Sequence, residues 1–311
     1  MPVRRGRSAL LLLVLAACAQ TPAPLPEGVE TRSLLGQSLR APALPPAVQA
    51  QRELELQQAE AQARAHPDDE AAQIWWGRRL GYLGRFRAAI AVYTDALARH
   101  PDSPRLLRHR GHRWITLREF DRAIADLQRA AARIAGQPDE VEPDGQPGPR
   151  GEPTSTLGFN VWYHLGLAQY LAGAFDAAEQ SYARCLAEYC RHPERRVAAT
   201  HWLWMVRMRA GREAEAMTLL SGLQESSDVV DNRAYLGLCL LYRGQRQAGE
   251  LLAAATSGND FATVGYGVAN WWLQQGQRQR GLELLQRVVA QGPWPAFGCI
   301  AAEAELRRLQ S

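Results

Sequence analysis

The sequence predicts an all-α solenoid of about six antiparallel helix pairs, with a cap helix at each end. Two observations carry this prediction: a 34-residue pattern runs twice in succession over residues 70–137, and alternating strand patterns are absent. A fixed period of this length is typical of stacked helical pairs, in which each unit packs on its neighbours. The two copies share residues at matching positions: Gly77 and Gly111, Phe86 and Phe120, Ala89 and Ala123, and Ala96 and Ala130.

These residue types at this spacing resemble the tetratricopeptide repeat (TPR). The resemblance implies a right-handed superhelix over residues 51–311 and a protein-binding role. Within each copy, small residues let the paired helices approach closely, and large residues fill the gaps between neighbouring pairs. In the first copy a glycine, Gly84, ends the first helix, whereas Arg118 stands at the matching place in the second.

The solenoid is expected to begin with a polar cap helix at 51–66 and to end with an amphipathic cap at 296–309. The expected repeats are 70–103, 104–136, one beginning at about 159, 197–229, 230–258 and 262–294. An insertion at 136–157 interrupts the period and is rich in proline, glycine and acidic residues, so we expect a disordered surface loop. A calcium loop is the alternative, but the acidic residues lack EF-hand spacing.

The amino terminus predicts a lipid anchor. Residues 1–17 combine an arginine-rich start with an apolar run too short to span a bilayer. The ending Leu15-Ala16-Ala17-Cys18 resembles the bacterial lipobox, which implies that Cys18 is lipidated and that the protein is held in the cell envelope. Ala19 favours the outer membrane, facing the periplasm, by the same resemblance. An ordinary secretory signal is the alternative. The proline-rich segment 18–50 is expected to be an extended tether.

Charge and motifs exclude several function classes. The formal charge is +4, and removal of Arg4, Arg5 and Arg7 with the signal leaves 33 basic and 32 acidic residues, which is too neutral for a nucleic-acid binder. No motif of a nucleotide-binding, hydrolase or zinc-protease site is present, so we expect no enzyme and no cofactor. His109 and His112 lie one helical turn apart, but a metal needs three or four ligands.

The cysteines beyond Cys18 are Cys185, Cys190, Cys239 and Cys299, and none forms a CxxC motif. Cys185 and Cys190 are five residues apart on an expected helix, too far for relaxed disulfide geometry. We expect buried, free thiols, although a long-range bridge in an oxidising compartment stays open.

The TPR resemblance also names a candidate binding surface, the concave groove lined by the first helix of each repeat. Carried onto this chain, its residues are Arg78, Tyr82, Arg105, Arg108, His112, Asn160, Tyr163, Tyr170, His201, Arg209, Tyr242, Tyr266 and Asn270. Arginine and tyrosine are frequent interface anchors. The arginines gather in the first two repeats, so the expected partner is an envelope protein or peptide with acidic residues or a free carboxylate. Ile74 and Arg78 do not match the chaperone-binding TPR clamp.

The function expected from these features is that of a non-enzymatic adaptor or scaffold that is anchored to the envelope and binds a partner through its groove. In layout the chain is similar to envelope adaptor lipoproteins, which recruit cell-wall hydrolases, pilot pilus secretins or help to assemble outer-membrane barrels. Three alternatives stay open. The partner uses the convex face or the insertion, the chain acts on cell-wall glycan or peptidoglycan, or it is a self-assembling scaffold.

Overall fold

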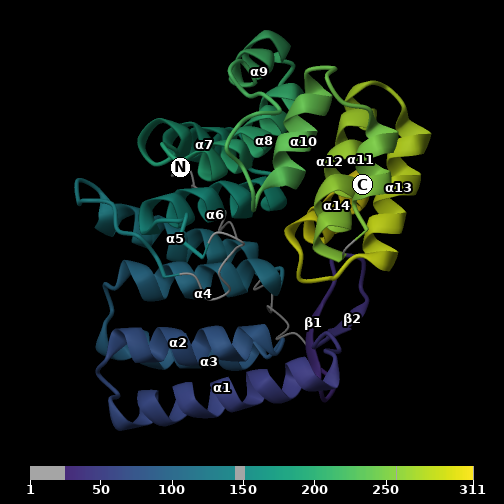
Figure 1. Ribbon diagram of the computed structural model, residues 1–311. Coiled ribbons are helices and arrows are strands. Elements are labelled where there is room, and N and C mark those ends of the chain that lie inside the picture. The colour runs from purple at the N-terminus through teal and green to yellow at the C-terminus, as the bar shows by residue number, and fades with distance from the viewer. Residues whose placement is uncertain (1–24, 144–150, 257, 311) are drawn as a thin grey trace, which may run out of the picture.

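Helical hairpins stacked side by side make up almost all of the structure (Figure 1). The computed structural model describes residues 25–143, 151–256 and 258–310. A cap helix, α1 (Pro46–Ala65), precedes the first pair. The six pairs are α2 (Glu70–Tyr82) with α3 (Phe86–Arg99), α4 (Pro104–Thr116) with α5 (Phe120–Ile134), α6 (Leu157–Ala172) with α7 (Phe175–Glu188), α8 (Pro193–Arg209) with α9 (Glu213–Leu219), α10 (Arg233–Tyr242) with α11 (Ala248–Ala254), and α12 (Gly258–Gln274) with α13 (Arg278–Gln291). A last helix, α14 (Phe297–Gln310), closes the chain.

This arrangement confirms the predicted all-α, TPR-like solenoid with six pairs and two cap helices. The repeat glycines sit where the second helix of a pair places a large side chain. A Cβ atom on Gly111 would lie 2.8 Å from Leu127, and one on Gly166 would lie 2.8 Å from Tyr182. Both contacts are closer than a side chain tolerates, so these positions need glycine. None of the helices in the described ranges is long and apolar enough to cross a membrane.

The turn inside every pair contains a residue in the left-handed region of backbone space. Five of the six are glycines, for which this conformation costs little, and the second pair instead has Arg118 with φ 65°. The others are Gly84, Gly173, Gly211, Gly244 and Gly276. The sequence substitution of Arg118 for glycine therefore keeps the turn but places a long charged side chain at its tip.

The segment before α1 differs from the extended tether predicted for 18–50. Two short strands, β1 (Val29–Arg32) and β2 (Ser38–Arg40), pair antiparallel in a hairpin. Val29 and Thr31 are buried, and the Thr31 hydroxyl donates to the Leu117 carbonyl over 2.8 Å. A proline-rich segment cannot build its own core, but here its few apolar side chains pack on a surface that the helices supply. Residues 1–24, including the predicted signal and Cys18, lie outside the described residues.

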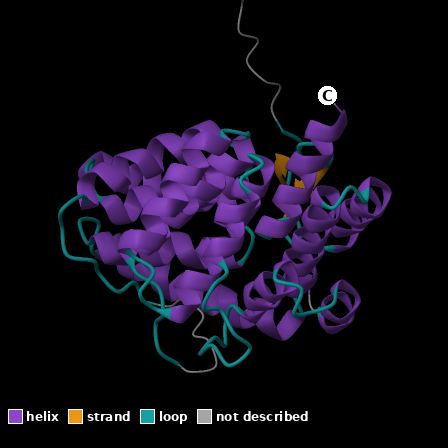
Figure 2. Ribbon diagram, turned by 90° about the horizontal axis from the view of Figure 1, so that it is seen from above, coloured by secondary structure: helices purple, strands orange, loops and turns teal. Residues whose placement is uncertain are grey.

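The hairpin joins the two ends of the solenoid. Leu34 donates its backbone N–H to the Glu303 carboxylate of α14 over 3.0 Å, and Trp294 Nε1 donates to the Arg40 carbonyl over 2.7 Å. Figure 1 shows the hairpin between the beginning of α1 and the lower end of α14, and Figure 2 shows the strands from above, beside the carboxy-terminal helices. The superhelix therefore curls until its last helices meet its first repeats.

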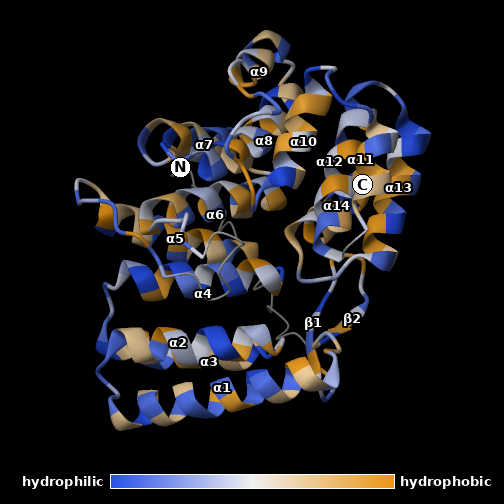
Figure 3. Cartoon of the chain, viewed as in Figure 1, coloured by the Kyte–Doolittle hydropathy of each residue, from blue (hydrophilic) through white to orange (hydrophobic). Residues whose placement is uncertain are grey.

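The core follows the inner helices. In the described residues the largest fully buried side chains include Trp202 and Trp204 of α8, Tyr170 of α6 and Tyr266 of α12. The cap helix α1 buries only Leu56 and Ala63, and Figure 3 shows hydrophilic residues along much of its length. A polar outer surface is what a terminal repeat needs for solubility.

Candidate interaction site

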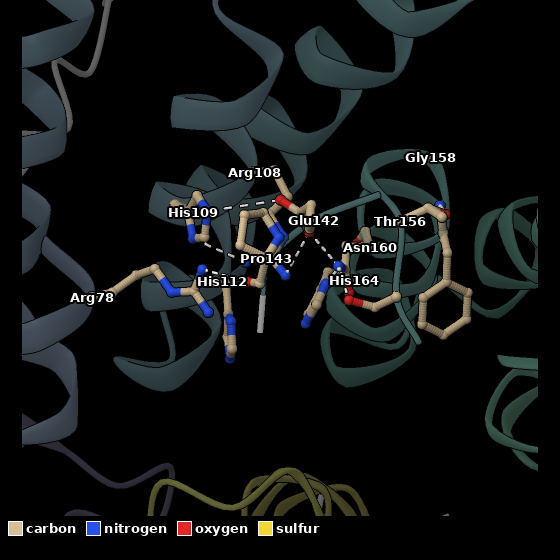
Figure 4. Close-up of polar contacts among 12 residues, drawn as sticks. Arg78, Arg108, His109, His112, Glu142, Pro143, Thr156, Gly158, Asn160 and His164 are labelled. Carbon is tan, nitrogen blue, oxygen red and sulfur yellow. Dashed lines mark hydrogen bonds and ion pairs between the residues drawn. The ribbon is translucent and has the colours of Figure 1, made fainter. Parts of the chain in front are cut away.

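The first three pairs bring a cluster of basic and polar side chains onto their inner surface. Arg78 comes from α2, Arg108 and His109 from α4, and Asn160 and His164 from α6 (Figure 4). Each of these residues lies on the first helix of its pair, and the inner surfaces of successive first helices are adjacent in a solenoid. The TPR-based prediction therefore places Arg78, Arg108 and Asn160 together, as the structure does.

The centre of this cluster is Glu142, which belongs to the insertion. Its Oε2 atom lies 3.0 Å from Arg108 Nη2 and accepts a hydrogen bond from the Asn160 amide, while Oε1 lies 3.7 Å from His109 Nε2. The Glu142 side chain is only 10% exposed and that of Arg108 12%. A carboxylate this buried stays charged only where a cation and hydrogen-bond donors compensate the lost hydration. Arg108 and Asn160 supply both.

The residues on either side of Glu142 are held as well. Arg78 Nη1 donates to the Pro143 carbonyl over 2.8 Å, and Arg105 pairs with Glu140 over 2.7 Å at the exposed edge. The backbone of the same segment pairs with the end of the insertion, where Glu142 N–H donates to Ser155 O over 3.1 Å. We call residues 139–143 the acidic strap. It is an extended acidic segment bound on the inner surface of the solenoid.

The acidic strap corrects part of the prediction that 136–157 is disordered. Asp139 accepts a hydrogen bond from the Gly158 N–H over 2.9 Å at the start of α6, and Arg195 lies 3.7 Å from its other oxygen. The carboxylates of this segment accept hydrogen bonds and form ion pairs with buried or half-buried donors, and these contacts hold the segment in place. An acidic, proline-rich composition alone does not indicate such contacts. The middle of the insertion, 144–150, lies outside the described residues.

The imidazoles of this site are neutral. Burial lowers the pKa of His109 and His112 well below the usual range, and the neighbouring arginines lower both further. Burial likewise lowers the pKa of His164 to about 3. The charge of the site at neutral pH therefore resides on Arg78, Arg105 and Arg108, balanced in part by the acidic strap.

His109 and His112 do not converge on a common point. His109 faces Glu142 and stacks on Tyr93 with ring centroids 5.8 Å apart, whereas His112 stacks on His164 at 4.6 Å. Across the described residues, no group of three or more His, Cys, Asp or Glu side chains is arranged to hold a metal ion.

The remaining predicted groove residues have a different environment. Tyr163, Tyr170, His201, Tyr242, Tyr266 and Asn270 are all buried. Their polar atoms bond to one another and to neighbouring side chains: the Tyr170 and Tyr266 hydroxyls lie 2.6 Å apart, and Tyr242 OH lies 3.1 Å from His201 Nδ1. Arg209, half-buried, pairs with Glu305 of α14.

This burial corrects the prediction of an open groove along all six repeats. Closure of the solenoid places α14 against α12, α13 and α6, so the inner surfaces of the later pairs become interior. The accessible part of the predicted surface comprises Arg78, Tyr82, Arg105, Arg108 and His112, together with the acidic strap. The strap residues Glu140 and Glu142 were missed as site residues, although acidic residues opposite an arginine cluster are a signal that the sequence contains.

The chain is similar to several solved structures. No family model matches it, and no curated protein matches it. YrrB, described as a TPR protein with an unusual peptide-binding site, is 13% identical and has a TM-score of 0.41, with 80% of this chain and 97% of YrrB covered. A TPR protein from Parabacteroides merdae is 15% identical with a TM-score of 0.49, covering 84% and 94%. PilW, a type IV pilus biogenesis factor, is 18% identical with a TM-score of 0.44, covering 78% and 89%. At these values the similarity concerns the arrangement of helices alone.

Proposed function

We propose that the protein is a non-enzymatic interaction scaffold that binds an acidic segment of a partner protein on the inner surface of its first three helix pairs. The observation that carries the proposal is the set of contacts around the acidic strap. Arg108 and Asn160 hold the Glu142 carboxylate, and Arg78 holds the next carbonyl. A surface that holds one extended acidic segment in this way offers the donors that a similar segment of a partner needs.

The partner competes with the acidic strap for the same donors. A segment tethered in the same chain acts at an effective concentration of about millimolar, so it is displaced only by a ligand with a better set of contacts. Charge-assisted hydrogen bonds to Arg78 and Arg108 supply recognition, and the exposed Arg105 attracts the acidic segment at longer range. Binding is therefore expected to weaken as salt concentration rises.

A peptide titration tests the binding site directly. The probe is PDEVEP, the sequence of residues 138–143, and the host is the Glu140→Gln/Glu142→Gln variant, in which the acidic strap has lost its charges. We expect this variant to bind the peptide at least about tenfold more tightly than the unaltered protein does, because the competing carboxylates are gone. A peptide with glutamine at both glutamate positions is the control probe.

The arginines supply the decisive control. Adding Arg108→Gln to the Glu140→Gln/Glu142→Gln variant should abolish peptide binding. Adding Arg122→Gln, at an exposed position of α5, should leave peptide binding unchanged. Equal binding of the two peptides, or binding that survives Arg108→Gln, would show that the inner surface does not recognise acidic segments. The chain contains no lysine, so partner capture in envelopes needs a photo-reactive residue, placed for example at the exposed Val141.

The proposed location is the periplasmic side of the bacterial outer membrane, through a lipid on Cys18. The support is the run Leu15-Ala16-Ala17-Cys18 after an arginine-rich start. Metabolic labelling with a radioactive fatty acid should mark the unaltered protein but not a Cys18→Ser variant. Labelling that persists in the variant would contradict lipidation at this residue.

A further inference from the structure

A hollow lies between the first repeats and the carboxy-terminal helices. Its volume is about 520 Å³. Residues of α1, α2, α3, α4 and the segment after the hairpin line one side, and residues of α10, α12, α14 and the loop before α14 line the other. Leu83, Phe86 and Phe297 are among its apolar walls. Cavities of this size that combine apolar walls with a few polar groups are typical of small-molecule sites.

The charged groups that line this hollow are all basic. Arg52 and Arg113 contribute guanidinium groups, and none of the described residues that line the cavity is an aspartate or a glutamate. Arg52 Nη1 donates to the Tyr82 carbonyl over 2.6 Å. His112 also lines the cavity, but its lowered pKa keeps it neutral. Among the lining residues that the structure describes, the hollow therefore has two positive charges and no carboxylate that balances them.

Arg113 is the unusual member of the pair. Its Nη2 atom lies 2.8 Å from the His112 ring and its guanidinium lies 5.4 Å from the Phe86 ring centroid. It forms no ion pair with any described residue, whereas Arg108, Arg110 and Arg118 each pair with a carboxylate. Burial lowers the pKa of Arg113 to about 10, and the guanidinium groups of Arg108 and Arg78 also lower it.

A half-buried cation without a counterion has lost hydration, and the contacts of Arg113 with the neutral His112 ring and the Phe86 ring replace only part of it. An anion placed in the hollow would restore the lost interaction, because a guanidinium offers a carboxylate or phosphate two parallel hydrogen bonds. The apolar walls would at the same time cover a hydrocarbon or aromatic body. Charge and shape point to the same class of ligand.

We propose that this hollow binds a small organic anion, with its carboxylate or phosphate head against Arg113 and Arg52 and its apolar body against Phe86 and Phe297. The hollow adjoins the surface that holds the acidic strap and shares Tyr82 and His112 with it, but Arg78, Arg108 and Asn160, which hold the strap, are not among its lining residues. The proposal therefore stands whether or not that surface binds a partner.

Calorimetric titration of the full chain with four probes tests the proposal. Octanoate and octyl phosphate carry the two possible heads, octan-1-ol lacks the charge, and inorganic phosphate lacks the apolar body. We expect saturable one-to-one binding of at least one of the two charged amphiphiles, and the tighter of them identifies the head group. Octan-1-ol and inorganic phosphate should each bind at least about tenfold more weakly, because each lacks one half of the interaction.

Variants assign the binding to the hollow. Arg113→Met keeps an apolar stem without the charge and should weaken the charged probe at least about tenfold, while Arg113→Lys should retain part of the affinity. Arg52→Met, which removes the second cation of the hollow, provides a second test if the Arg113→Met protein does not fold. Arg122→Gln is the control for charge on a distant exposed surface. The proposal is overturned if no amphiphile binds, if octan-1-ol binds as well as octanoate, or if binding survives both methionine variants.

Discussion

Arg118 and Glu303 form a bidentate ion pair between positions 185 residues apart in the sequence. Arg118 Nη2 lies 2.5 Å from one carboxylate oxygen of Glu303, and Nε lies 3.1 Å from the other. Both side chains are 3% exposed. Arg118 occupies the turn position at which the other five pairs have glycine, so the chain tolerates an unfavourable backbone conformation in order to place this guanidinium against α14.

Replacing Arg118 with glycine should destabilise the protein in spite of the better backbone. The glycine removes about 1 kcal/mol of left-handed strain, but the buried Glu303 loses its cation, which typically costs about 3–5 kcal/mol. We therefore expect a net loss of about 2–4 kcal/mol in the free energy of unfolding by urea. Adding Glu303→Gln should recover part of the loss, because it removes the unpaired charge. An Arg118→Gly protein as stable as the original would show that the ion pair does not hold the closure.

Glu194 is predicted to control the start of α10. Its buried carboxylate accepts hydrogen bonds from three successive backbone N–H groups, those of Val230, Asp231 and Asn232. Glu194→Ala should lower the free energy of unfolding by about 3 kcal/mol, because hydrogen bonds to a charged group are each worth about 1.5–3 kcal/mol. Hydrogen exchange should speed up at these three amides first. Glu215→Ala, at an exposed position of α9, is the control, and equal effects of the two changes would contradict the prediction.

His201 is predicted to make stability depend on pH. Burial among Trp202, Tyr235 and Tyr242 lowers its pKa to about 3, whereas the unfolded chain has a value near 6.5. Between these values the unfolded state binds a proton that the folded state does not, so the contribution is complete above pH 6.5 and is lost as pH falls toward 3.

The measurement is the free energy of unfolding at pH 7 and pH 4.5, for the unaltered protein and for His201→Gln. One such group changes the free energy of unfolding by at most about 1.4 kcal/mol per pH unit. Below pH 6.5 the free energy of unfolding of the variant should therefore fall less steeply with decreasing pH, by about this amount per pH unit. His66→Gln, at an exposed position after α1, is the control. Identical slopes in all three proteins would show that His201 is protonated without unfolding.

The four cysteines of the described chain are predicted to be unreactive in the native state. All are buried and free, as the sequence predicted. Burial raises the pKa of the Cys185 and Cys239 thiols and raises that of Cys299 to about 12, so little thiolate is present at pH 8. We expect iodoacetamide to label these residues far more slowly in the native protein than in urea. Rapid native labelling, located by mass spectrometry, would contradict this.

The Cys185–Cys190 pair differs from expectation in one respect. The helix ends at Glu188, so Cys190 turns back, and its Sγ atom lies 3.7 Å from that of Cys185. The five-residue spacing therefore does not keep the two thiols apart. A chemical oxidant such as diamide should join them slowly in the native protein, because burial suppresses the thiolate that reacts first, and a Cys190→Ser protein should show no such product. Failure of the unaltered protein to form the bridge would mean that burial blocks the reaction.

Much of the helical architecture could be predicted because the residues that pack the helices together recur at the same positions of each repeat. Gly111 and Gly166 recur at fixed places, and each is required by a large side chain on the paired helix. The closure could not be predicted in the same way, because the contact between Arg118 and Glu303 depends on the summed rotation between all the helix pairs that lie between them. Arg118 was nevertheless visible as the one position that breaks the glycine rule.

Only the solenoid residues of the candidate site, and not the acidic residues that they contact, were predicted from the sequence. The TPR resemblance named Arg78, Arg108 and Asn160 as groove residues, at different positions of three successive first helices. It could not identify Glu142 as their partner, because the insertion lies outside the repeat and its path depends on contacts such as Asp139 with α6. Tyr170 is buried against Tyr266 of α12 and His201 against Tyr235 and Tyr242 of α10, and these contacts between helix pairs cannot be read from the period alone.

The closure has a consequence for biosynthesis. In an open repeat array, early units can fold as soon as their neighbours exist, and the order of synthesis matters little. Here Glu303, near the end of the chain, satisfies both Arg118 and the Leu34 amide, so the amino-terminal hairpin and the second repeat lack their final partner until the last helix is made. A chain that stops before α14 leaves the Arg118 guanidinium and the Leu34 N–H without their acceptor, so the closure can form only after α14 has been made.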